Sequence, residues 1–401
     1  MSRLEALIQQ YCPDGVEYVK LGDVAQVGTG SSNGNEAVDE GAYPFFVRSQ
    51  TVKRKDDYEY DEEAIIIPGE GGIGDIFHYV NGKYALHQRV YRIHFTTSDL
   101  NVKFVFYYMR SAFKKFIMMK AVNATVTSIR KPMIESFEIP VPPMPVQEEI
   151  VRILDSFTEL QAELQAELQK RKQQYNYYLD NLLSFNNINK GGYREEVRWM
   201  KMSEVGTFYS GLSGKSKDDF QNGNAKFITY VNVFNHPALE TDVEDKVKIM
   251  DGEKQNTVQY GDLLFTGSSE TPDECGMCSV LTHHTDEKLY LNSFCFGFRF
   301  NNLSGINPDF MKFLFRSSAI RKLICKTANG VTRYNVSKKE FAKIVIPIPS
   351  IEIQNQIATI LDKFYSLIGD ISIGLPAEIE KRQQQYEYYR DRLLTFKRKG
   401  A

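Results

Sequence analysis

Residues 170–185 read KRKQQYNYYLDNLLSF, and residues 381–396 read KRQQQYEYYRDRLLTF. Eleven of the sixteen positions are identical. Upstream of these stretches, IPVPPMPVQEEIVRILDSF (139–157) returns as IPIPSIEIQNQIATILDKF (346–364), with nine of nineteen positions identical. The chain is therefore a tandem duplication, in which each copy has a globular region, a proline-rich junction and a helical segment. The period is far longer than that of solenoid repeats, so the sequence predicts two domains and not a stacked array.

The helical segments carry apolar residues at alternating spacings of three and four. In the first copy this stripe runs from Ile150 to Phe185 as a heptad-like seam with one stutter. A continuous helix over 146–185 would be about 60 Å long, because each residue adds ~1.5 Å. Such a helix cannot hide its seam inside a small domain, so it needs a helical partner. The second copy carries a similar stripe and is the obvious partner, although Gly374 and Pro376 predict a break in it.

The globular regions are rich in predicted strands. Each region also contains one predicted helix, near 101–119 in the first copy and near 307–326 in the second. Mixed patterns of this kind predict α+β domains. The predicted strands include EAIIIPG (63–69), YALHQRVYRIHF (84–95), AKFITYVNVF (225–234), GDLLFTG (261–267) and SFCFGFRF (293–300).

The composition excludes several classes of protein. The 401 residues are 42% hydrophobic and 12% aromatic, which is typical of a globular chain long enough for two or more domains. No apolar run approaches the ~18–20 residues that a membrane span needs. Five cysteines do not suggest a disulfide framework, so a reducing cytoplasm is the expected location. With 49 basic and 51 acidic residues the net charge is −2, so any DNA contact must come from local clusters or be shared with a partner.

Two glycine-rich motifs resemble nucleotide-binding loops but lack their context. GEGGIG (69–74) follows a predicted strand, yet the aromatic, β-rich sequence after it does not predict the helix that a dinucleotide-binding fold requires. GLSGKS (211–216) is two residues shorter than a phosphate-binding loop, and no long helix is predicted after it. We interpret both motifs as loops.

Two further patterns could bind a metal ion. Asp273, Asp286 and Lys288 fit a loose nuclease pattern, in which two carboxylates and a lysine hold Mg²⁺ and position a water. A chain with 25% charged residues often matches such a pattern by chance, and HHTDEKLY (283–290) is predicted as a hairpin turn. Cys275 and Cys278, with two histidines following, are zinc-like ligands, but no second pair stands at a typical spacing. Neither pattern identifies a catalytic centre or a metal site.

The order of these parts resembles the specificity subunit of type I restriction-modification systems. The resemblance covers essentially the whole chain. It rests on the two P-x-x-x-x-Q-x-x-I-x-x-I-L-D-x-F starts (142–157 and 349–364) and on the two KR-x-QQY-x-YY-x-D-x-LL ends within 170–185 and 381–396. The globular regions match only loosely, as is expected of the target-recognition domains of that family.

The resemblance implies an α+β tandem duplication of two globular α/β target-recognition domains, each followed by a long conserved helix. The two helices would pair as an antiparallel coiled-coil spacer. The implied target-recognition domains are 1–141 and 188–348. The implied central helix is 142–187, and the C-terminal helix is 349–401, broken near 374–376.

The resemblance also implies that the chain is not catalytic. Each recognition domain would read one half of a split site in double-stranded DNA, and the helices would dock two modification (methyltransferase) subunits. Restriction (translocase and nuclease) subunits would join this assembly. S-adenosylmethionine, ATP and Mg²⁺ would be used by the partners, and this chain would bind no cofactor. A duplicated chain has pseudo-twofold symmetry, so it offers two similar surfaces to two similar partners. The candidate docking residues are Lys170, Arg171, Gln174, Lys381, Arg382 and Gln385.

DNA contacts are expected from polar side chains in loops, close to glycines and basic residues, because these can reach base edges and phosphates. In the first domain the candidates are Arg48, Ser49, Gln50, Lys53, Arg54, His87, Gln88, Arg89, Thr127, Ser128, Arg130 and Lys131. In the second domain they are Tyr230, Asn232, Asn292, Ser293, Arg333, Tyr334 and Asn335.

Two other interpretations of the chain stay open at this point. A two-headed coiled-coil scaffold would show the same repeat without reading DNA, and a gel shift with a methyltransferase partner would distinguish it. A stand-alone Mg²⁺-dependent nuclease would use Asp273, Asp286 and Lys288, and cleavage of DNA by the isolated chain would favour it.

Overall fold

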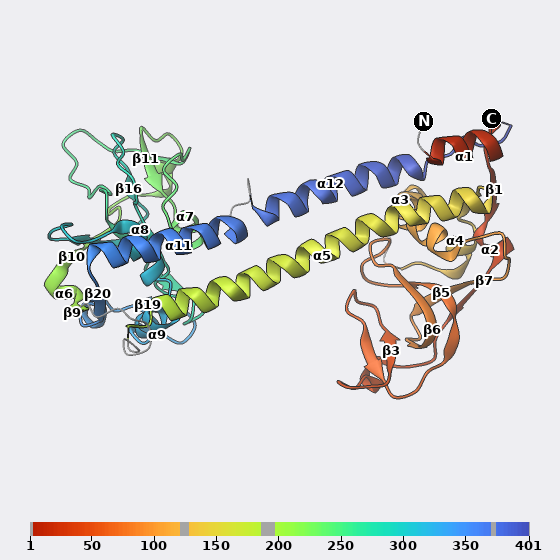
Figure 1. Ribbon diagram of the computed structural model, residues 1–401, viewed down its shortest axis with the longest axis horizontal. Helices are drawn as coiled ribbons and strands as arrows, with labels where there is room; N and C mark the ends of the chain where they lie inside the picture. Colours follow the sequence, from red (N-terminus) through yellow and green to blue (C-terminus); the bar gives the residue numbers. More distant parts are fainter. Residues whose placement is uncertain (1–2, 121–127, 186–196, 370–373, 401) are drawn as a thin grey trace. The chain divides into compact units, whose positions relative to one another are not determined.

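The computed structural model describes residues 3–120, 128–185, 197–369 and 374–400. The chain forms two compact units (Figure 1). Unit 1 comprises Met1–Gln165 and Glu378–Ala401, and unit 2 comprises Ala166–Ala377. Each unit therefore combines the globular region of one copy with helical segments from both copies.

The strands of unit 1 are β1 (Glu17–Lys20), β2 (Ala25–Thr29), β3 (Tyr43–Phe46), β4 (Lys53–Lys55), β5 (Tyr60–Pro68), β6 (His78–Leu86), β7 (Val90–Phe95) and β8 (Glu138–Val141). Among the described residues, six of them form one sheet in the order β2-β7-β5-β6-β3-β4. Its neighbouring strands are antiparallel, except that β3 runs parallel to β6. β1 and β8 form a separate antiparallel ladder.

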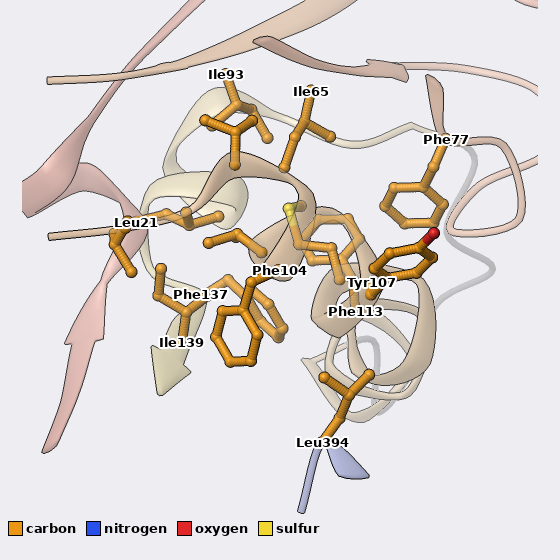
Figure 2. Close-up of a cluster of buried hydrophobic side chains, with 14 of the residues drawn as sticks. Leu21, Ile65, Phe77, Ile93, Phe104, Tyr107, Phe113, Phe137, Ile139 and Leu394 are labelled. Atoms are coloured by element: carbon orange, nitrogen blue, oxygen red, sulfur yellow. The ribbon is translucent and has the colours of Figure 1, made fainter. Parts of the chain in front are cut away.

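The core of unit 1 lies between this sheet and α3 (Val102–Lys120), whose apolar residues recur every three or four positions. Figure 2 shows Phe104 and Phe113 of α3 beside Ile65 and Ile93 of the sheet. Leu394, from the end of the second copy, lies in the same cluster and is buried. The first globular region is therefore completed by residues from the far end of the sequence. The other helices of unit 1 outside the long ones are α1 (Arg3–Tyr11), α2 (Leu21–Val24), η1 (Gly34–Glu36) and α4 (Lys131–Glu135).

The strands of unit 2 are β9 (Arg198–Lys201), β10 (Gly206–Ser210), β11 (Ala225–Ile228), β12 (Lys246–Val247), β13 (Leu263–Thr266), β14 (Ser268–Ser269), β15 (Cys278–Val280), β16 (Tyr290–Leu291), β17 (Cys295–Phe300), β18 (Ala328–Asn329), β19 (Tyr334–Val336) and β20 (Val345–Ile348). They form sheets in the orders β10-β17-β13-β15, β12-β11-β16, β14-β19-β18 and β20-β9. The short helices are α6 (Met202–Val205), η3 (Lys217–Phe220), α7 (Tyr230–Asn235), α8 (Pro308–Leu314), α9 (Ser318–Cys325) and α10 (Lys338–Phe341).

The two units share one strand arrangement. β2, β7 and β5 of unit 1 correspond to β10, β17 and β13 of unit 2. In unit 1, β6 pairs with β5 and also, in parallel, with β3. Unit 2 divides this strand into β15, which pairs with β13, and β16, which pairs in parallel with β11. The second copy is longer than the first mainly between β11 and β13, the stretch that contains α7 and β12, and to a lesser extent between β13 and β17.

Two predicted strands end earlier in the structure than the sequence pattern predicts. The stretch 84–95 is not one strand but two, since β6 and β7 are separated by a turn in which Val90 N–H donates to His87 O (2.9 Å). The stretch 225–234 is a strand only as far as Ile228. The Thr229 side chain then accepts from Asn232 N–H, which caps α7 and starts a helix instead.

Two other local predictions also differ from the structure. The predicted helix 307–326 is broken into α8 and α9, and the Ser317 hydroxyl donates to Leu314 O (2.7 Å) at the break. The stretch 283–290 is not a hairpin turn, because it connects β15 and β16, which belong to different sheets. The helix break has a local cause, whereas the second outcome is decided by which strands β15 and β16 pair with.

The long helix of the first copy is α5 (Met144–Leu182), which is continuous. The second copy supplies α11 (Ile351–Gly369) and α12 (Leu375–Leu393). Gly374 directly precedes α12, and Pro376 lies in its first turn, where a proline is tolerated because that N–H has no helical acceptor. The predicted domain boundaries stay predictions, since the compact units instead divide α5 between Gln165 and Ala166. None of the helices in the described parts of the chain has the length and apolar content that a bilayer crossing demands.

Within unit 1, α5 packs antiparallel against α12 through aromatic rings. Phe157 stacks on Tyr389 with ring centroids 5.7 Å apart and meets the edge of Tyr386 at 6.4 Å. Further along α5, the Gln161 side-chain amide bonds to Gln383. The order of these contacts shows that the two helices run in opposite directions. Tyr386 is buried here, as expected of a seam residue.

Unit 2 repeats this arrangement with the copies exchanged. Phe364 of α11 stacks on Tyr178 of α5, with ring centroids 4.8 Å apart. Tyr175 is buried and lies 6.0 Å from Tyr365. Phe157 and Phe364 occupy the same motif position in the two copies, and so do Tyr389 and Tyr178. Each unit thus pairs the start of one copy's helix with the end of the other's.

A fully buried glutamine holds the start of each long helix. The Gln147 amide nitrogen donates to Asp99 O (2.8 Å) and Pro142 O (2.6 Å), and its oxygen accepts from Asn101 N–H (2.8 Å). The glutamine therefore provides hydrogen-bond partners for three backbone groups, of which the Pro142 carbonyl is buried and the other two are partly buried.

Gln354 does the same in unit 2. Its amide nitrogen donates to Gly305 O and Pro349 O, each at 2.8 Å, and its oxygen accepts from Asn307 N–H (2.8 Å). The motif aspartates act about two turns further along the helix. There Asp155 accepts from Lys103 (2.7 Å) and Asp362 pairs with Lys312 (2.7 Å). The glutamine and the aspartate that both copies of the motif share thus attach each helix to its globular region.

Replacing Gln147 with Met keeps the volume of the side chain and removes all three hydrogen bonds. We expect unit 1 to lose about 3 kcal/mol or more of stability, because each buried backbone group left without a partner costs ~1–3 kcal/mol. Calorimetry should show a lower melting transition, and hydrogen exchange should show faster exchange of the Asn101 amide. Gln165→Met, at an exposed position of the same helix, is the control and should leave both unchanged. An unaltered transition in the Gln147 variant would contradict the role assigned to this side chain.

Candidate nucleic-acid interface

Four loops meet in unit 1 at residues 47–51, 69–75, 87–89 and 128–131, and we call them the loop cluster of unit 1. Backbone hydrogen bonds connect them. Gly69 N–H donates to Arg89 O (2.9 Å), His87 N–H donates to Phe46 O (3.0 Å), and Ile129 N–H donates to Gly69 O (2.7 Å). The positions of the loops are therefore fixed by main-chain contacts and not by the side chains that they present.

Unit 2 has the same three bonds between corresponding segments. Gly267 N–H donates to Phe294 O (2.7 Å), Asn292 N–H donates to Ile228 O (2.9 Å), and Val336 N–H donates to Gly267 O (3.0 Å). The loop cluster of unit 2 accordingly consists of residues 229–235, 267–277, 292–294 and 332–337. The duplicated frame makes Arg89 equivalent to Phe294, and His87 equivalent to Asn292.

In unit 1 two predicted arginines converge on a carboxylate that the sequence analysis did not select. Arg48 and Arg89 each place a guanidinium nitrogen on the same oxygen of Glu70, at 3.1 and 2.9 Å. The hydrogen bond from Arg89 and the positive charges hold the pKa of Glu70 below its usual value. Glu70 lies inside GEGGIG, so the signal was present in a loop that had been tested only for nucleotide binding. The structure places this motif between β5 and β6, as a loop.

His87 is buried in the turn between β6 and β7. Its Nδ1 accepts a hydrogen bond from Arg89 N–H (3.0 Å), so the ring organises the turn. Burial lowers the pKa of His87, and the charges of Arg48 and Arg89 lower it further. The imidazole is therefore neutral near pH 7 and has a structural role in the turn, while its selection as a base-contacting residue stays a prediction. In unit 2, Asn292 Oδ1 accepts from Phe294 N–H (2.8 Å) in the same way.

The remaining candidates of unit 1 fall into two groups. Arg54 donates to Gly41 O (2.8 Å) and Ala42 O (3.1 Å), so it supports the fold. The Gln88 amide donates to Asn33 Oδ1 (2.7 Å) at the surface. Thr127 lies outside the described residues. Ser128 is half-buried, and the other polar candidates of this unit are exposed: Ser49, Gln50, Lys53, Arg130 and Lys131.

In unit 2 the loop cluster surrounds a cavity of about 860 Å³. Tyr230, Phe294 and Arg333 line it together with Ser268 and Glu274. The Tyr230 hydroxyl donates to Ser268 O (2.8 Å), and Arg333 Nε donates to Ser268 Oγ (3.1 Å). The Arg333 guanidinium also lies over the Phe294 ring, 5.6 Å from its centroid. Two candidates, Tyr230 and Arg333, thus come together around a phenylalanine that the sequence analysis did not choose.

Asn232 is buried, and its amide bonds to the backbone of Glu240 in both directions, at 2.8 and 3.2 Å. It therefore holds α7 through one donor and one acceptor of its amide, and its selection as a base contact stays a prediction. Tyr334 accepts from the Cys275 thiol through its carbonyl oxygen (3.4 Å). Ser293 and Asn335 are exposed at the edge of the cluster.

The predicted docking residues form the same surface pattern on α5 and α12. Arg171 binds Glu167 (2.7 Å) and Gln174 (3.2 Å) on α5. Arg382 binds Glu378 (3.5 Å) and Gln385 (3.3 Å) on α12. Lys170 and Lys381 are exposed beside them.

An exposed tyrosine accompanies each of these patterns. Tyr177 is 64% exposed and Tyr388 is 61% exposed, at equivalent positions of the repeat. Each ring meets the edge of a seam tyrosine, Tyr178 or Tyr389, at 5.5 and 5.4 Å. Tyr175 and Tyr386 are buried in the seam, whereas the outward pair, Tyr177 and Tyr388, was not among the predicted docking residues.

The two metal-like patterns find little support in the geometry. Cys278 is fully buried, burial raises its pKa to about 12, and Cys275 is bonded to a backbone carbonyl. The Asp273 carbonyl accepts from Arg321 (2.8 Å). Within the described ranges there is no group of three or more metal-ligating side chains.

Comparison with known proteins identifies related chains. A family model described as type I restriction modification DNA specificity domain matches residues 13–171 and 194–381. The specificity subunit of the type I restriction enzyme EcoR124I/EcoR124II of Escherichia coli is 32% identical over 311 residues, which cover 74% of this chain and 71% of that subunit.

Solved structures agree in fold. The S subunit of a type I restriction-modification system from M. genitalium matches with a TM-score of 0.58 at 14% identity, covering 95% of this chain and 96% of that one. A chain from a structural study of complex assembly and conformational transition of the type I system matches with a TM-score of 0.57 at 13% identity, covering 95% and 97%.

Replacing His87 with Asn should preserve the turn and remove a titrating group, because Asn292 performs the same task in unit 2. The ordinary pKa of histidine is 6.5 and the folded value is lower, so below pH 6.5 the unfolded chain binds the proton more readily. The parent chain should therefore lose stability, relative to the variant, as the pH falls through 6.5. Thermal unfolding at about pH 7.5 and about pH 5.5 measures this difference. Parallel pH dependence of the two proteins would show that His87 is not held neutral by the fold.

Proposed function

We propose that units 1 and 2 each read one half of a split site in double-stranded DNA. The chain belongs to the type I restriction-modification DNA specificity family, and this membership is the premise of the proposal. The observation that carries this proposal is the duplicated loop cluster, in which the same backbone bonds present different side chains in the two units. Sequence is read by donors, acceptors and apolar groups at base edges, so a constant frame with different side chains suits two different base sequences.

The chain is a non-catalytic subunit, as its family implies. The proposal that it binds no cofactor follows from this, with S-adenosylmethionine, ATP and Mg²⁺ used by partner subunits. No observation favours a nuclease, because Asp286 and Lys288 lie in the connection between β15 and β16, and Asp273 is in the loop before β15. All five cysteines are free thiols, which supports a reducing cytoplasm as the location.

The helices are the proposed docking sites for two methyltransferase subunits, with restriction subunits joining later. Three features support this. Each site carries an arginine with an acidic and a glutamine partner, an exposed lysine and an exposed tyrosine. Tyr and Arg are the residues that most often dominate protein interfaces. The same set occurs once on α5 and once on α12, which suits two identical partners.

Exchange of one reading unit tests the half-site proposal. Replacing residues 12–139 with the equivalent region of a relative should change one half of the methylated sequence and leave the other half intact. Single-molecule sequencing of DNA methylated by the chain with a cognate methyltransferase reports both halves. The unaltered chain in the same background is the control. Loss of methylation at both halves in a chain that still binds its partner, or no change in either half, would contradict the two-reader proposal.

Removing the exposed tyrosines tests the docking proposal. Tyr177→Ala and Tyr388→Ala should each weaken binding of one methyltransferase subunit by roughly 30-fold, since a dominant interface residue contributes ~2 kcal/mol. Each single variant should then bind one partner tightly, and the double variant neither, as measured by native mass spectrometry. Gln169→Ala, at an exposed position of α5, is the control and should bind two. Tight binding of two partners by the double variant would rule out this face.

A further inference from the structure

One backbone position carries opposite chemistry in the two units. Arg89 and Phe294 each follow the turn that leads into the corresponding strand, β7 or β17. The carbonyl of each accepts from a glycine N–H, and the N–H of each is bound by the side chain two residues earlier. The Cα atoms are therefore held in the same way. The Arg89 side chain is 56% exposed and the Phe294 residue is 58% exposed.

Arg89 is held by Glu70 through only one guanidinium nitrogen, NH1. A guanidinium has five N–H donors arranged as a planar fork, so donors beyond this contact remain for a ligand. Arg48 bonds to the same Glu70 oxygen, which fixes the carboxylate between two cations. The result is a donor fork beside an acceptor, both at the surface of the loop cluster.

This combination matches the major-groove edge of one base pair. Guanine presents two acceptors, O6 and N7, and its partner cytosine presents the N4 amino donor. Arginine pairs bidentately with the guanine acceptors, and a carboxylate accepts from cytosine. In place of guanine O6, an adenine-thymine pair would present the adenine N6 amino group or the thymine methyl to the Arg89 guanidinium. Neither group accepts a hydrogen bond.

Phe294 offers no hydrogen bond at the equivalent place. An exposed phenylalanine gives up the favourable free energy that burying its ring would provide. Phe294 borders the cavity of the unit 2 loop cluster, and the Arg333 guanidinium lies over its ring. The thymine C5-methyl is the apolar feature of the major groove, and phenylalanine is among the residues that contact it.

We propose that this position selects the base-pair type in each half-site: Arg89, supported by Glu70, selects a guanine-cytosine pair, and Phe294 selects the methyl group of a thymine. The assignment rests on the proposed function, namely that both loop clusters read DNA. It adds which atoms are read and predicts that the two half-sites differ at equivalent positions.

Base analogues that change single atoms provide the test. The chain is assembled with a cognate methyltransferase, its site is mapped by single-molecule sequencing, and binding is measured on duplexes with one analogue at a time. Replacing one guanine of the first half-site with 7-deazaguanine removes N7 and should weaken binding roughly 5- to 150-fold. Replacing one thymine of the second half-site with uracil removes the methyl and should weaken it at least several-fold. The Arg89→Ala variant, which has no side-chain donor, should lose the response to 7-deazaguanine. The Phe294→Ala variant should lose the response to uracil.

Reciprocal variants extend the test. Phe294→Arg should change one position of the second half-site toward guanine-cytosine and leave the first half-site unchanged. Leu323→Arg adds the same charge on α9 of unit 2 and should leave the site unchanged. The decision rests on Arg89→Ala and Phe294→Ala, because both are truncations at exposed side chains and neither adds volume to the loop cluster. Full responses to both analogues in these two variants would overturn the assignment while leaving DNA reading intact. Absence of sequence-specific binding by the parent complex would instead overturn the proposed function.

Discussion

The seam of each unit depends on an aromatic ring from each copy of the repeat. Phe157 stacks on Tyr389 in unit 1, and Phe364 stacks on Tyr178 in unit 2. A helix of this length exposes an apolar stripe that its own globular region covers only at one end, so the far end must be covered by another helix. Because the covering helix comes from the other copy, neither unit is complete without both halves of the chain. Buried Leu394 in the core of unit 1 shows the same dependence.

The repeated motif gains its meaning from this arrangement. Gln147 and Gln354 satisfy backbone groups at the start of the helix, and Asp155 and Asp362 pair with lysines of the globular region. These contacts attach each helix rigidly to the region that precedes it. The polar residues on the outward faces of the helices are then available to bind partner subunits. This explains why the pattern of arginine, lysine and tyrosine occurs in both copies of the repeat.

The loop clusters follow a different rule. Three main-chain hydrogen bonds are the same in both units, whereas the side chains differ at equivalent positions such as Arg89 and Phe294. A frame made of backbone hydrogen bonds does not depend on side-chain identity, so substitutions at Arg89 or Phe294 change chemistry without moving the loop. This separation between frame and side chain is the physical basis for the proposed reading of two unlike half-sites.

The sequence by itself determined the duplication, the long helices, the seam and the family. These features are periodic or local. Ile150, Ile153 and Phe157 recur at helical spacing, and the same residues stand in both copies, so no knowledge of contacts is needed. Only the tertiary structure decided which loop residues meet. Glu70 and Arg89 are brought together by the pairing of β5 with β7, and Thr229 converts a strand-like stretch into α7 by a cap. The sequence predicted that His87 and Asn232 contact bases. In the structure both are buried, and their hydrogen bonds to the backbone give them structural roles. Such outcomes depend on contacts between residues far apart in the sequence, which composition and spacing do not encode.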